Sequence, residues 1–520
     1  MAQTDSQSRD KSSVASRRHP EYAERKTHWE FLEACYEGGR DWFDVNIFKY
    51  LKEGDKEFED RKKRAYRFNH TREVVDLVNK YIFRTNVARN EVDAADSIVK
   101  FWKSATPDGH DIDYLMQQLC KRSSISGRIY VVVDNTATIA PNSKAEETDI
   151  DTYAYWVGPQ DALDMSFDKM GRLNWILLRE KYRNDESPFE KDSPIQQEQF
   201  RLWTRTGWEL FRYDVSSDTS TSVDETKRKV SSISSGVHNL GLVPVIIMDH
   251  MDDDSLYSSP ALINDIAYMD RAAANYLSNL DAIIQDQTFS QLAMPAQGLM
   301  PGEEEKVEEK MMEIGTKRIF IYNGEGGVAP AFLSPDPKQA ELIITAIRTI
   351  INEIYHTVGM AGERTKEDNS MGIDNSSGVA KAYDFERVNA LLTNKSKSLA
   401  KAERAISYLV AKWNGDEYED DLIVWAENFD VRGLASEFEI ATSLSLVAAP
   451  DTVRREQMKM LVEKLFPTAS KDLKAKMINE IDTEWPPEPE DFGLGEDSGE
   501  DSGEDSSDNS DNDNPDVNDE

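Results

Sequence analysis

Residues 259–287 read SPALINDIAYMDRAAANYLSNLDAIIQDQ, the strongest helix signal in the chain. Ser259 followed by Pro260 is a typical helix start, because the hydroxyl caps free amides and the proline ring fits the first turn. Apolar side chains then recur at alternating spacings of four and three residues, on one face of a helix; they are Leu262, Ile266, Met269, Ala273, Tyr276, Leu280 and Ile283. The segment predicts a rod on the order of 45 Å long at about 1.5 Å per residue.

Two more long helices are predicted further along the chain. The first, at residues 336–359, begins at Asp336-Pro337, ends at Gly359 and repeats the four-three spacing with Ala340, Ile344, Ile347, Ile351, Ile354 and Val358. A polar segment follows at 360–377, and another apolar stripe predicts a helix over 378–414. The polar residues 393–398 in the middle of that helix predict a kink or a face toward water.

The segments around these helices predict a mixed α+β fold. Residues 22–257 combine amphipathic helix patterns with β-branched runs, of which Gly127–Asp134 is the clearest buried strand. Further strands are expected at residues 153–157, 175–179, 200–203, 208–212 and 243–248. The mostly non-helical segment 288–335 contains a strand candidate at Ile319, Phe320, Ile321 and Tyr322, and residues 415–486 read as a small helical module.

Both ends of the chain are polar. Residues 1–21 are expected to be a flexible lead-in. Residues 487–520 hold fifteen acidic residues and no Lys or Arg, and they repeat Gly-Glu-Asp-Ser three times from Gly495. They predict disorder, because they offer too little apolar surface to bury.

The charge of the chain limits how it could treat DNA. The formal net charge is −36, and about −20 remains without the acidic tail. Affinity for DNA comes mainly from Lys and Arg that replace counterions on phosphates. We therefore expect a protein that could surround DNA but would not grip it.

No motif for chemistry stands out. There is no Walker A pattern and no His-Glu-x-x-His zinc motif. Cys35 and Cys120 are too few for a disulfide framework and predict two reduced, buried thiols. His110 among acids and the run Asp252–Asp254 are more typical of solvated turns than of metal sites. No catalytic, cofactor or metal residue is predicted, enzyme activity is not expected, and no apolar run is long enough to span a membrane.

The order of the segments resembles that of the portal proteins of tailed bacteriophages. Short motifs agree with this: Phe68-Asn69 before a helix resembles the start of the portal wing, Gly241–Val245 the turn before the stem, and Ser376–Ala380 the start of the tunnel helix. The resemblance implies an α+β portal fold with a flexible N-terminus (1–21), wing (22–257), first stem helix (258–287), clip (288–335), second stem helix (336–359), tunnel loop (360–377), tunnel helix (378–414), helical crown (415–486) and disordered acidic tail (487–520).

The resemblance also implies a function. Portal proteins form a ring of about twelve subunits at one capsid vertex, through which DNA is packaged and ejected. The implied partners are other copies of the chain, double-stranded DNA that passes without sequence readout, the terminase large subunit, head-completion or adaptor proteins and tail proteins, and the major capsid and scaffolding proteins. No cofactor and no membrane is implied, and the chain would be made in the host cytoplasm and end in the virion.

Three groups of site residues follow from this mapping. The stem stripes are expected to pack between helices or between subunits through Leu262, Ile266, Met269, Leu280, Ile344, Ile347, Ile351 and Ile354. The opposite faces are expected to line the channel with Asp265, Asp270, Asn275, Asp281, Glu341, Arg348 and Asn352. The tunnel loop is expected to touch DNA briefly through Arg364 and Lys366, which stand among Glu363, Asp368 and Asn369; a solvated loop of mixed charge is the alternative.

Other classes of protein remain open. An acidic scaffold or histone-like chaperone would bind basic proteins through the tail, but the ordered succession of helices would then be unexplained. The two stripes could also form an ordinary antiparallel helix pair in one core. A metal-dependent hydrolase would need a buried carboxylate cluster that the sequence does not indicate.

Overall fold

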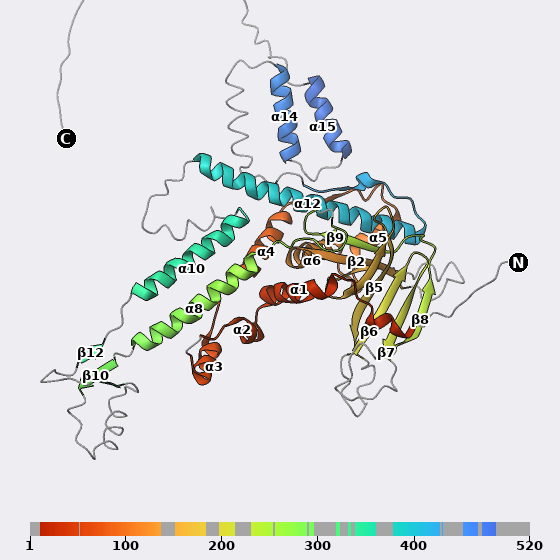
Figure 1. The fold of residues 1–520 in the computed structure, drawn as a ribbon. Coiled ribbons are helices and arrows are strands. Elements are labelled where there is room, and N and C mark those ends of the chain that lie inside the picture. Colours follow the sequence, from red (N-terminus) through yellow and green to blue (C-terminus); the bar gives the residue numbers. More distant parts are fainter. Residues whose placement is uncertain are drawn as a thin grey trace, which may run out of the picture. The chain divides into compact units, whose positions relative to one another are not determined.

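The computed structural model describes residues 11–50, 53–136, 151–183, 197–213, 230–252, 255–288, 291–295, 319–322, 331–333, 338–359, 378–426, 429, 451–465 and 471–484. The chain divides into two compact units, Met1–Gly433 with Pro467–Ser470 and Leu434–Phe466 with Lys471–Glu520. In the second unit, α14 (Asp451–Leu465) packs against α15 (Lys471–Glu484), and Lys459 Nζ lies 2.8 Å from Asp482 Oδ1. The other elements belong to the first unit (Figure 1).

Helices near the N-terminus build the larger core of the first unit. They are α1 (Tyr22–Glu37), α2 (Arg40–Asn46), α3 (Asp55–Arg64), α4 (His70–Ile82), α5 (Asp96–Lys103) and α6 (Ile112–Ser126). The apolar stripe of α4, which follows Phe68-Asn69 in the sequence, is buried, with Val74 and Val78 both fully inaccessible to solvent. It meets Phe101 of α5 and Leu119 of α6 in a continuous apolar cluster, so the predicted amphipathic helix is confirmed.

Strand β2 (Arg128–Asn135) lies between two cores. It pairs antiparallel with β3 (Thr152–Val157) and with β9 (Val245–Asp249). Ile129 and Val131 join the helical core, while Tyr130 and Val132 join a second core under a larger sheet. Because both of its faces are covered, the strand reads as an uninterrupted apolar run, which is the pattern that predicted it.

The larger sheet is an antiparallel meander in the order β4-β5-β6-β7-β8. Its strands are β4 (Ala162–Phe167), β5 (Leu173–Tyr182), β6 (Gln197–Thr204), β7 (Gly207–Tyr213) and β8 (Val230–Val237). The strands expected at residues 175–179, 200–203 and 208–212 are confirmed as β5, β6 and β7, and those expected at 153–157 and 243–248 are confirmed as β3 and β9 of the other sheet. β4 and β8 were not predicted; β8 has the sequence VSSISSGV, which lacks the apolar alternation of a half-buried strand.

The expectation of a flexible N-terminus is wrong for residues 11–21. Residues Lys11–Ser16 form a 3-10 helix, and Ala15 is buried against the larger sheet. Arg17 Nε donates to Asp164 Oδ2 at 2.9 Å, and the His19 ring stacks on Tyr257 at 3.7 Å. A polar composition therefore did not prevent ordering, because a few contacts to β4 and Tyr257 hold the segment.

Two long helices project side by side from the helical core (Figure 1). They are α8 (Ile266–Thr288) and α10 (Lys338–Thr357). Between them in sequence stands a small sheet in the order β11-β10-β12, formed by Gln291–Pro295 (β10), Ile319–Tyr322 (β11) and Ala331–Leu333 (β12). The strand predicted at Ile319–Tyr322 is confirmed.

The predicted helix start at Ser259-Pro260 is wrong, because α8 begins at Ile266. The preceding residues pack against the end of α6 instead: Leu262 N donates to Ser124 O at 3.1 Å. Gly127 has φ +82°, and a Cβ atom there would lie 2.0 Å from Ser259 O. The close approach of the two backbones holds residues 259–262 out of a helix, and it requires glycine at 127.

The third long helix, α12 (Gly378–Asn414), has the bounds that the sequence predicts. It packs against the sheet formed by β2, β3 and β9. It contacts α4, α5, α6, β2 and β9. The helix is continuous through its polar middle, where Lys395, Ser396 and Ser398 are at most 4% exposed. Asn394 and Lys397 of the same segment are exposed, so the expected face toward water is confirmed for these two residues only. After α12, the short strand β13 (Ile423–Val424), which lies within the segment 415–486 that the sequence indicates as mostly helical, pairs with β1 (Ala88–Arg89).

Candidate functional site

The α8–α10 pair is held together by the predicted apolar stripes. Leu277, Leu280 and Ile347 are buried between the helices, and Ala340, Ile343 and Ile351 pack against them. Of the predicted packing residues, Ile266, Leu280, Ile347 and Ile354 are buried, Leu262, Met269 and Ile351 are partly buried, and Ile344 is 38% exposed. Most of the two stripes thus pack within one chain.

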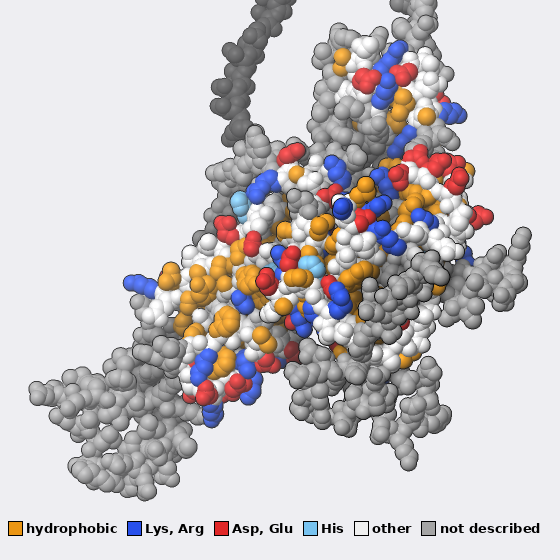
Figure 2. All heavy atoms as spheres, turned by 45° about the vertical axis from the view of Figure 1, so that its right-hand side comes forward, with side chains coloured by type: hydrophobic (Ala, Val, Ile, Leu, Met, Phe, Trp, Pro, Cys, Tyr) orange, Lys and Arg blue, Asp and Glu red, His pale blue; other side chains and the backbone are white. Residues whose placement is uncertain are grey.

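Apolar side chains remain exposed on the other faces of the pair. Leu342 of α10 is 71% exposed, and Tyr268 and Tyr276 of α8 are 44% and 39% exposed. Hydrophobic side chains gather over this part of the surface in Figure 2. An apolar surface outside the intramolecular contact is typical of a protein interaction site.

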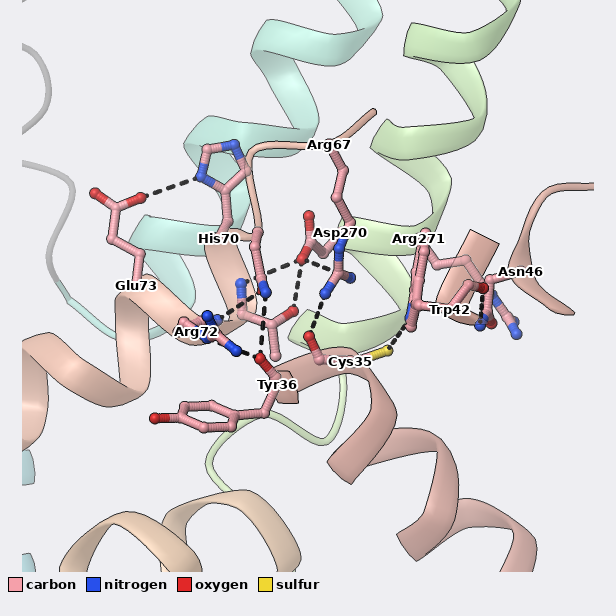
Figure 3. A network of polar contacts seen from close by, with 12 residues as sticks. Cys35, Tyr36, Trp42, Asn46, Arg67, His70, Arg72, Glu73, Asp270 and Arg271 are labelled. Atoms are coloured by element: carbon pink, nitrogen blue, oxygen red, sulfur yellow. Dashed lines mark hydrogen bonds and ion pairs between the residues drawn. The ribbon is translucent and has the colours of Figure 1, made fainter. Parts of the chain in front are cut away.

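A buried ion pair joins α8 to the helices near the N-terminus (Figure 3). Asp270 is 1% exposed, and its Oδ2 atom accepts from Thr71 Oγ1 at 2.7 Å and from Thr71 N at 3.2 Å. Arg67 Nη1 lies 3.4 Å from the same oxygen, and its guanidinium stands 4.0 Å from the centre of the Trp42 ring and donates to Cys35 O. Burial lowers the pKa of Arg67, although the nearby Asp270 acts in the opposite direction.

The first turn of α4 also holds α10. The Tyr355 hydroxyl donates to Glu73 Oε2 and lies 3.1 Å from His70 Nδ1. The start of this turn is fixed by Asn69, which has φ +45° and accepts from Arg72 N at 3.0 Å. Asp270 of α8 and Tyr355 of α10 are therefore both bound to a single helical turn, residues 70–73.

Helix α3 binds the side of α8 that faces away from α10, through Arg61. Its guanidinium is 2% exposed and donates to Glu53 Oε2 at 2.7 Å, Phe48 O at 2.8 Å and Ser278 Oγ at 2.9 Å. The hydrogen bond from Arg61 lowers the pKa of Glu53. Asn275 Oδ1 accepts from Phe48 N at 3.0 Å. These bonds tie residues 46–64 to α8.

The predicted channel-facing residues divide into two groups. Asp265, Glu341, Arg348 and Asn352 are exposed, as a channel lining requires. The prediction is wrong for Asp270, which is buried in the ion pair with Arg67, and Asp281 is partly buried and lies 3.3 Å from Arg64 of α3. Asn275 is occupied by the backbone of residues 46–48. Helical periodicity indicated that these side chains lie away from α10, but it gave no indication that residues 46–71 cover that face of α8.

A second buried polar cluster lies where α12 crosses α6 and the end of β9. Lys395 is fully buried, and its Nζ atom donates to Ser123 Oγ at 2.6 Å and lies 3.0 Å from His250 Nδ1. Burial lowers the pKa of Lys395 to about 8. Burial, and then the nearby Lys395, lower the pKa of His250 well below its usual value. Burial raises the pKa of Cys120 to about 11, as expected for an inert thiol.

The other half of α12 is fixed by a buried carboxylate. Glu403 is fully buried and accepts from Arg89 Nε at 2.6 Å and from Trp425 Nε1 at 2.7 Å. Burial raises the pKa of Glu403, while Arg89 acts against that rise. The ion pair connects α12 to the β1–β13 ribbon, so α12 is anchored in the first unit at two polar points, Lys395 and Glu403.

The remaining site predictions are not tested by the described residues. The tunnel-loop residues Glu363, Arg364, Lys366, Asp368 and Asn369 lie outside them, as does the acidic tail 487–520. Within the described ranges, no group of three or more His, Cys, Asp or Glu side chains is arranged to hold a metal ion, and no helix there is long and apolar enough to cross a membrane. Cys35 and Cys120 are buried free thiols, as predicted.

Comparison with known proteins gives a likeness of fold only. No protein-family model matches the chain, and no curated protein matches it. The chain is similar to one in the virion of a native gene transfer agent particle, with 12% identity and a TM-score of 0.40 over 86% of this chain and 97% of that one. It is also similar to chains in the neck of the empty particle with C6 symmetry (13% identity, TM-score 0.39, 81% and 98% covered) and of the native particle with C12 symmetry (12%, 0.34, 78% and 89%). The proposals below rest on the chain's own elements.

Proposed function

We propose that the chain is a portal subunit of a tailed bacteriophage or a related particle, and that it forms a ring through which DNA is packaged and ejected. The observation that carries the proposal is the order of the elements. A mixed wing leads to α8, a small sheet, α10, the segment 360–377, the long helix α12 and a separate helical unit. This is the order of wing, stem, clip, stem, tunnel loop, tunnel helix and crown.

The charge supports a channel that does not retain DNA. Twelve copies of a chain with net charge −36 would surround the duplex with acidic groups. Repulsion between these groups and phosphates acts within about 8–10 Å at physiological salt. Asp265 and Glu341 are exposed at different ends of the α8–α10 pair and would contribute to this lining. The duplex could then slide without being bound at any one site.

The partners follow from the same assignment. The small sheet β10–β12 would meet the terminase large subunit during packaging and then head-completion and tail proteins. The wing would contact the major capsid and scaffolding proteins, and the subunit would reside in the virion at the portal vertex. The proposal assigns the chain no catalytic step, since the energy for packaging would come from the terminase.

Electron microscopy of the purified full-length protein tests the proposal. We expect closed rings of about twelve subunits with a central hole, because a heterologous interface closes into a cyclic assembly. Monomers or compact dimers at every concentration, combined with tight binding of basic proteins, would instead identify an acidic chaperone.

A packaging assay tests the segment 360–377. Changing Arg364 and Lys366 together to Ala should slow or stall DNA packaging while rings still form, because two cations that could contact phosphates are lost. The matched control changes Lys169 and Arg172, on an exposed turn of the wing, to Ala. Normal packaging with the loop variant would contradict the proposed DNA contact.

A further inference from the structure

We infer that neighbouring subunits join through two specific faces: the outward face of α10 on one copy packs against the face of α2 and α8 on the next, and Glu353 meets Arg271. The inference rests on the proposed ring and names the contact that would build it. It assigns a role to side chains that the packing inside one chain leaves exposed.

The receiving face is centred on Arg271 of α8. Its guanidinium carbon lies 4.7 Å from the ring centre of Phe31, 5.0 Å from that of Tyr268 and 5.3 Å from that of Phe48. We call these three rings the aromatic collar. In the part of the chain that the structure describes, no carboxylate is ion-paired with Arg271. The collar fixes the cation by cation–π contacts, so binding a carboxylate would cost little side-chain entropy.

Apolar surface surrounds the collar. Phe48 is 53% exposed and Tyr268 is 44% exposed, and Val45 of α2, three residues before Phe48 in the chain, is 76% exposed. Arginine and aromatic residues carry most of the binding energy in protein interfaces. An arginine that is held among exposed rings therefore fits an acidic protein partner.

The inserting face is a stripe on α10 formed by Leu342, Thr345, Thr349 and Glu353, which we call the outer stripe. All four residues are exposed, and their spacing of three and four places them opposite the residues that contact α8. Thr345 and Thr349 donate their hydroxyls to carbonyls one turn earlier, at 2.8 and 3.0 Å. The stripe thus presents methyl groups and can be buried without leaving unpaired donors.

The two faces have the geometry of a heterologous contact. Helix α8 lies between α10 on one side and α2 and α3 on the other (Figure 1). One chain therefore cannot bring its own outer stripe onto its own collar. A subunit with different, complementary faces on opposite sides is the unit from which a ring closes.

The faces also match in level and charge. Asp270 and Tyr355 are bound to the same turn of α4, so their neighbours Arg271 and Glu353 lie at one level of the helix pair. Rotation about a ring axis does not change a residue's position along that axis. If α8 and α10 run roughly parallel to the axis, Glu353 of one subunit therefore lies at the same position along it as Arg271 of the next. In the described part of the chain, Glu353 has only His356 within ion-pair distance, at 3.9 Å. Its carboxylate can therefore pair with the neighbour's Arg271.

A charge swap tests the pair in the full-length protein. R271E and E353R should each raise the subunit concentration needed for half of the chains to be in rings by on the order of tenfold or more, because like charges would face each other at every boundary. The double variant R271E/E353R should restore most of the assembly. K169E, a matched reversal on an exposed wing turn, should assemble like the wild type.

Disulfide cross-linking provides an independent readout that does not depend on the charge pair. V45C and T349C are introduced in separate preparations, and the two are mixed under oxidising conditions. We expect a covalent dimer from the mixture and from neither variant alone, since the native thiols Cys35 and Cys120 are buried.

The outcomes separate the two proposals. Wild-type rings together with unimpaired assembly of R271E and E353R, or no rescue and no cross-link in the mixture, would overturn the assigned contact and leave the portal function standing. Absence of rings from the wild-type protein would overturn the portal function itself.

Discussion

Changing Asp270 to Ala should lower the local stability of the junction between α8 and α4 by about 3–5 kcal/mol, because it leaves a buried cation without its partner. Arg67 is 5% exposed on its side chain, so water cannot replace the lost carboxylate. Thr71 would also lose the acceptor for its hydroxyl and its amide. Hydrogen exchange of the amides in α4 and the first half of α8, measured in the full-length protein, reports this loss.

Two further variants separate the charge from the hydrogen bonds. Asp270→Asn keeps an acceptor for Thr71 but removes the charge, so it should cost less than Asp270→Ala. The double variant R67M/D270L replaces both ions with apolar groups, so it should recover the part of the stability that the unpaired cation costs, while the loss of the acceptor for Thr71 remains. Exchange protection unchanged in Asp270→Ala would show that the buried pair does not hold the junction.

Changing Lys395 to Met should make the anchoring of α12 more stable at pH 7. It should also remove the rise in stability with pH that the titration of Lys395 causes. The pKa of Lys395 is about 8 in the folded protein against 10.5 for an ordinary lysine. Below pH 8, Lys395 is protonated in both the folded and the unfolded protein, so the free energy of folding includes the full cost of burying its charge. Between about pH 8 and 10.5 only the unfolded state holds the proton, so stability rises with pH. The total rise amounts to roughly 3 kcal/mol.

The measurement compares wild type with K395M from pH 7 to 10.5 by hydrogen exchange in α12 and α6. The difference between them isolates Lys395 from its neighbours, since the raised pKa of Cys120 makes stability fall with pH in part of this range. His250 and Asp249, the other titratable groups facing the site, are common to both proteins. We expect the advantage of K395M at pH 7 to shrink as the pH rises. An advantage that stays constant with pH would show that Lys395 titrates normally.

The sequence predicted which segments form long elements, because periodicity is a local property. The helices at 336–359 and 378–414 and the buried strand β2 were found almost at their bounds. The Ser259-Pro260 signal failed because it is overruled by the backbone contact of residues 259–262 with α6 and Gly127. A local cap signal carries no information about such a tertiary contact.

The buried charges could not be placed from the sequence. Arg67 and Asp270 are about two hundred residues apart, and each looks like an ordinary surface residue in its own segment. Lys395 stands in a polar stretch of a helix, which favoured exposure, yet Ser123 and His250 from distant segments surround it. The collar around Arg271 likewise combines α1, α8 and the segment after α2. Among the predicted polar site residues, helical spacing correctly indicated exposure only for Asp265, Glu341, Arg348 and Asn352.

The first turn of α4 has a mechanical consequence. Asp270 and Tyr355 are both bound to residues 70–73, so α8 and α10 are held by the same turn at the end where they join the helical core. They also share the apolar contact between them. A force applied to the end of α10 is transmitted to α8 through this turn, because closely packed side chains leave little free volume for local displacement. The two helices should therefore tilt together as one rigid body. Movement of one relative to the other would require breaking the hydrogen bonds of Asp270 and Tyr355 to this turn.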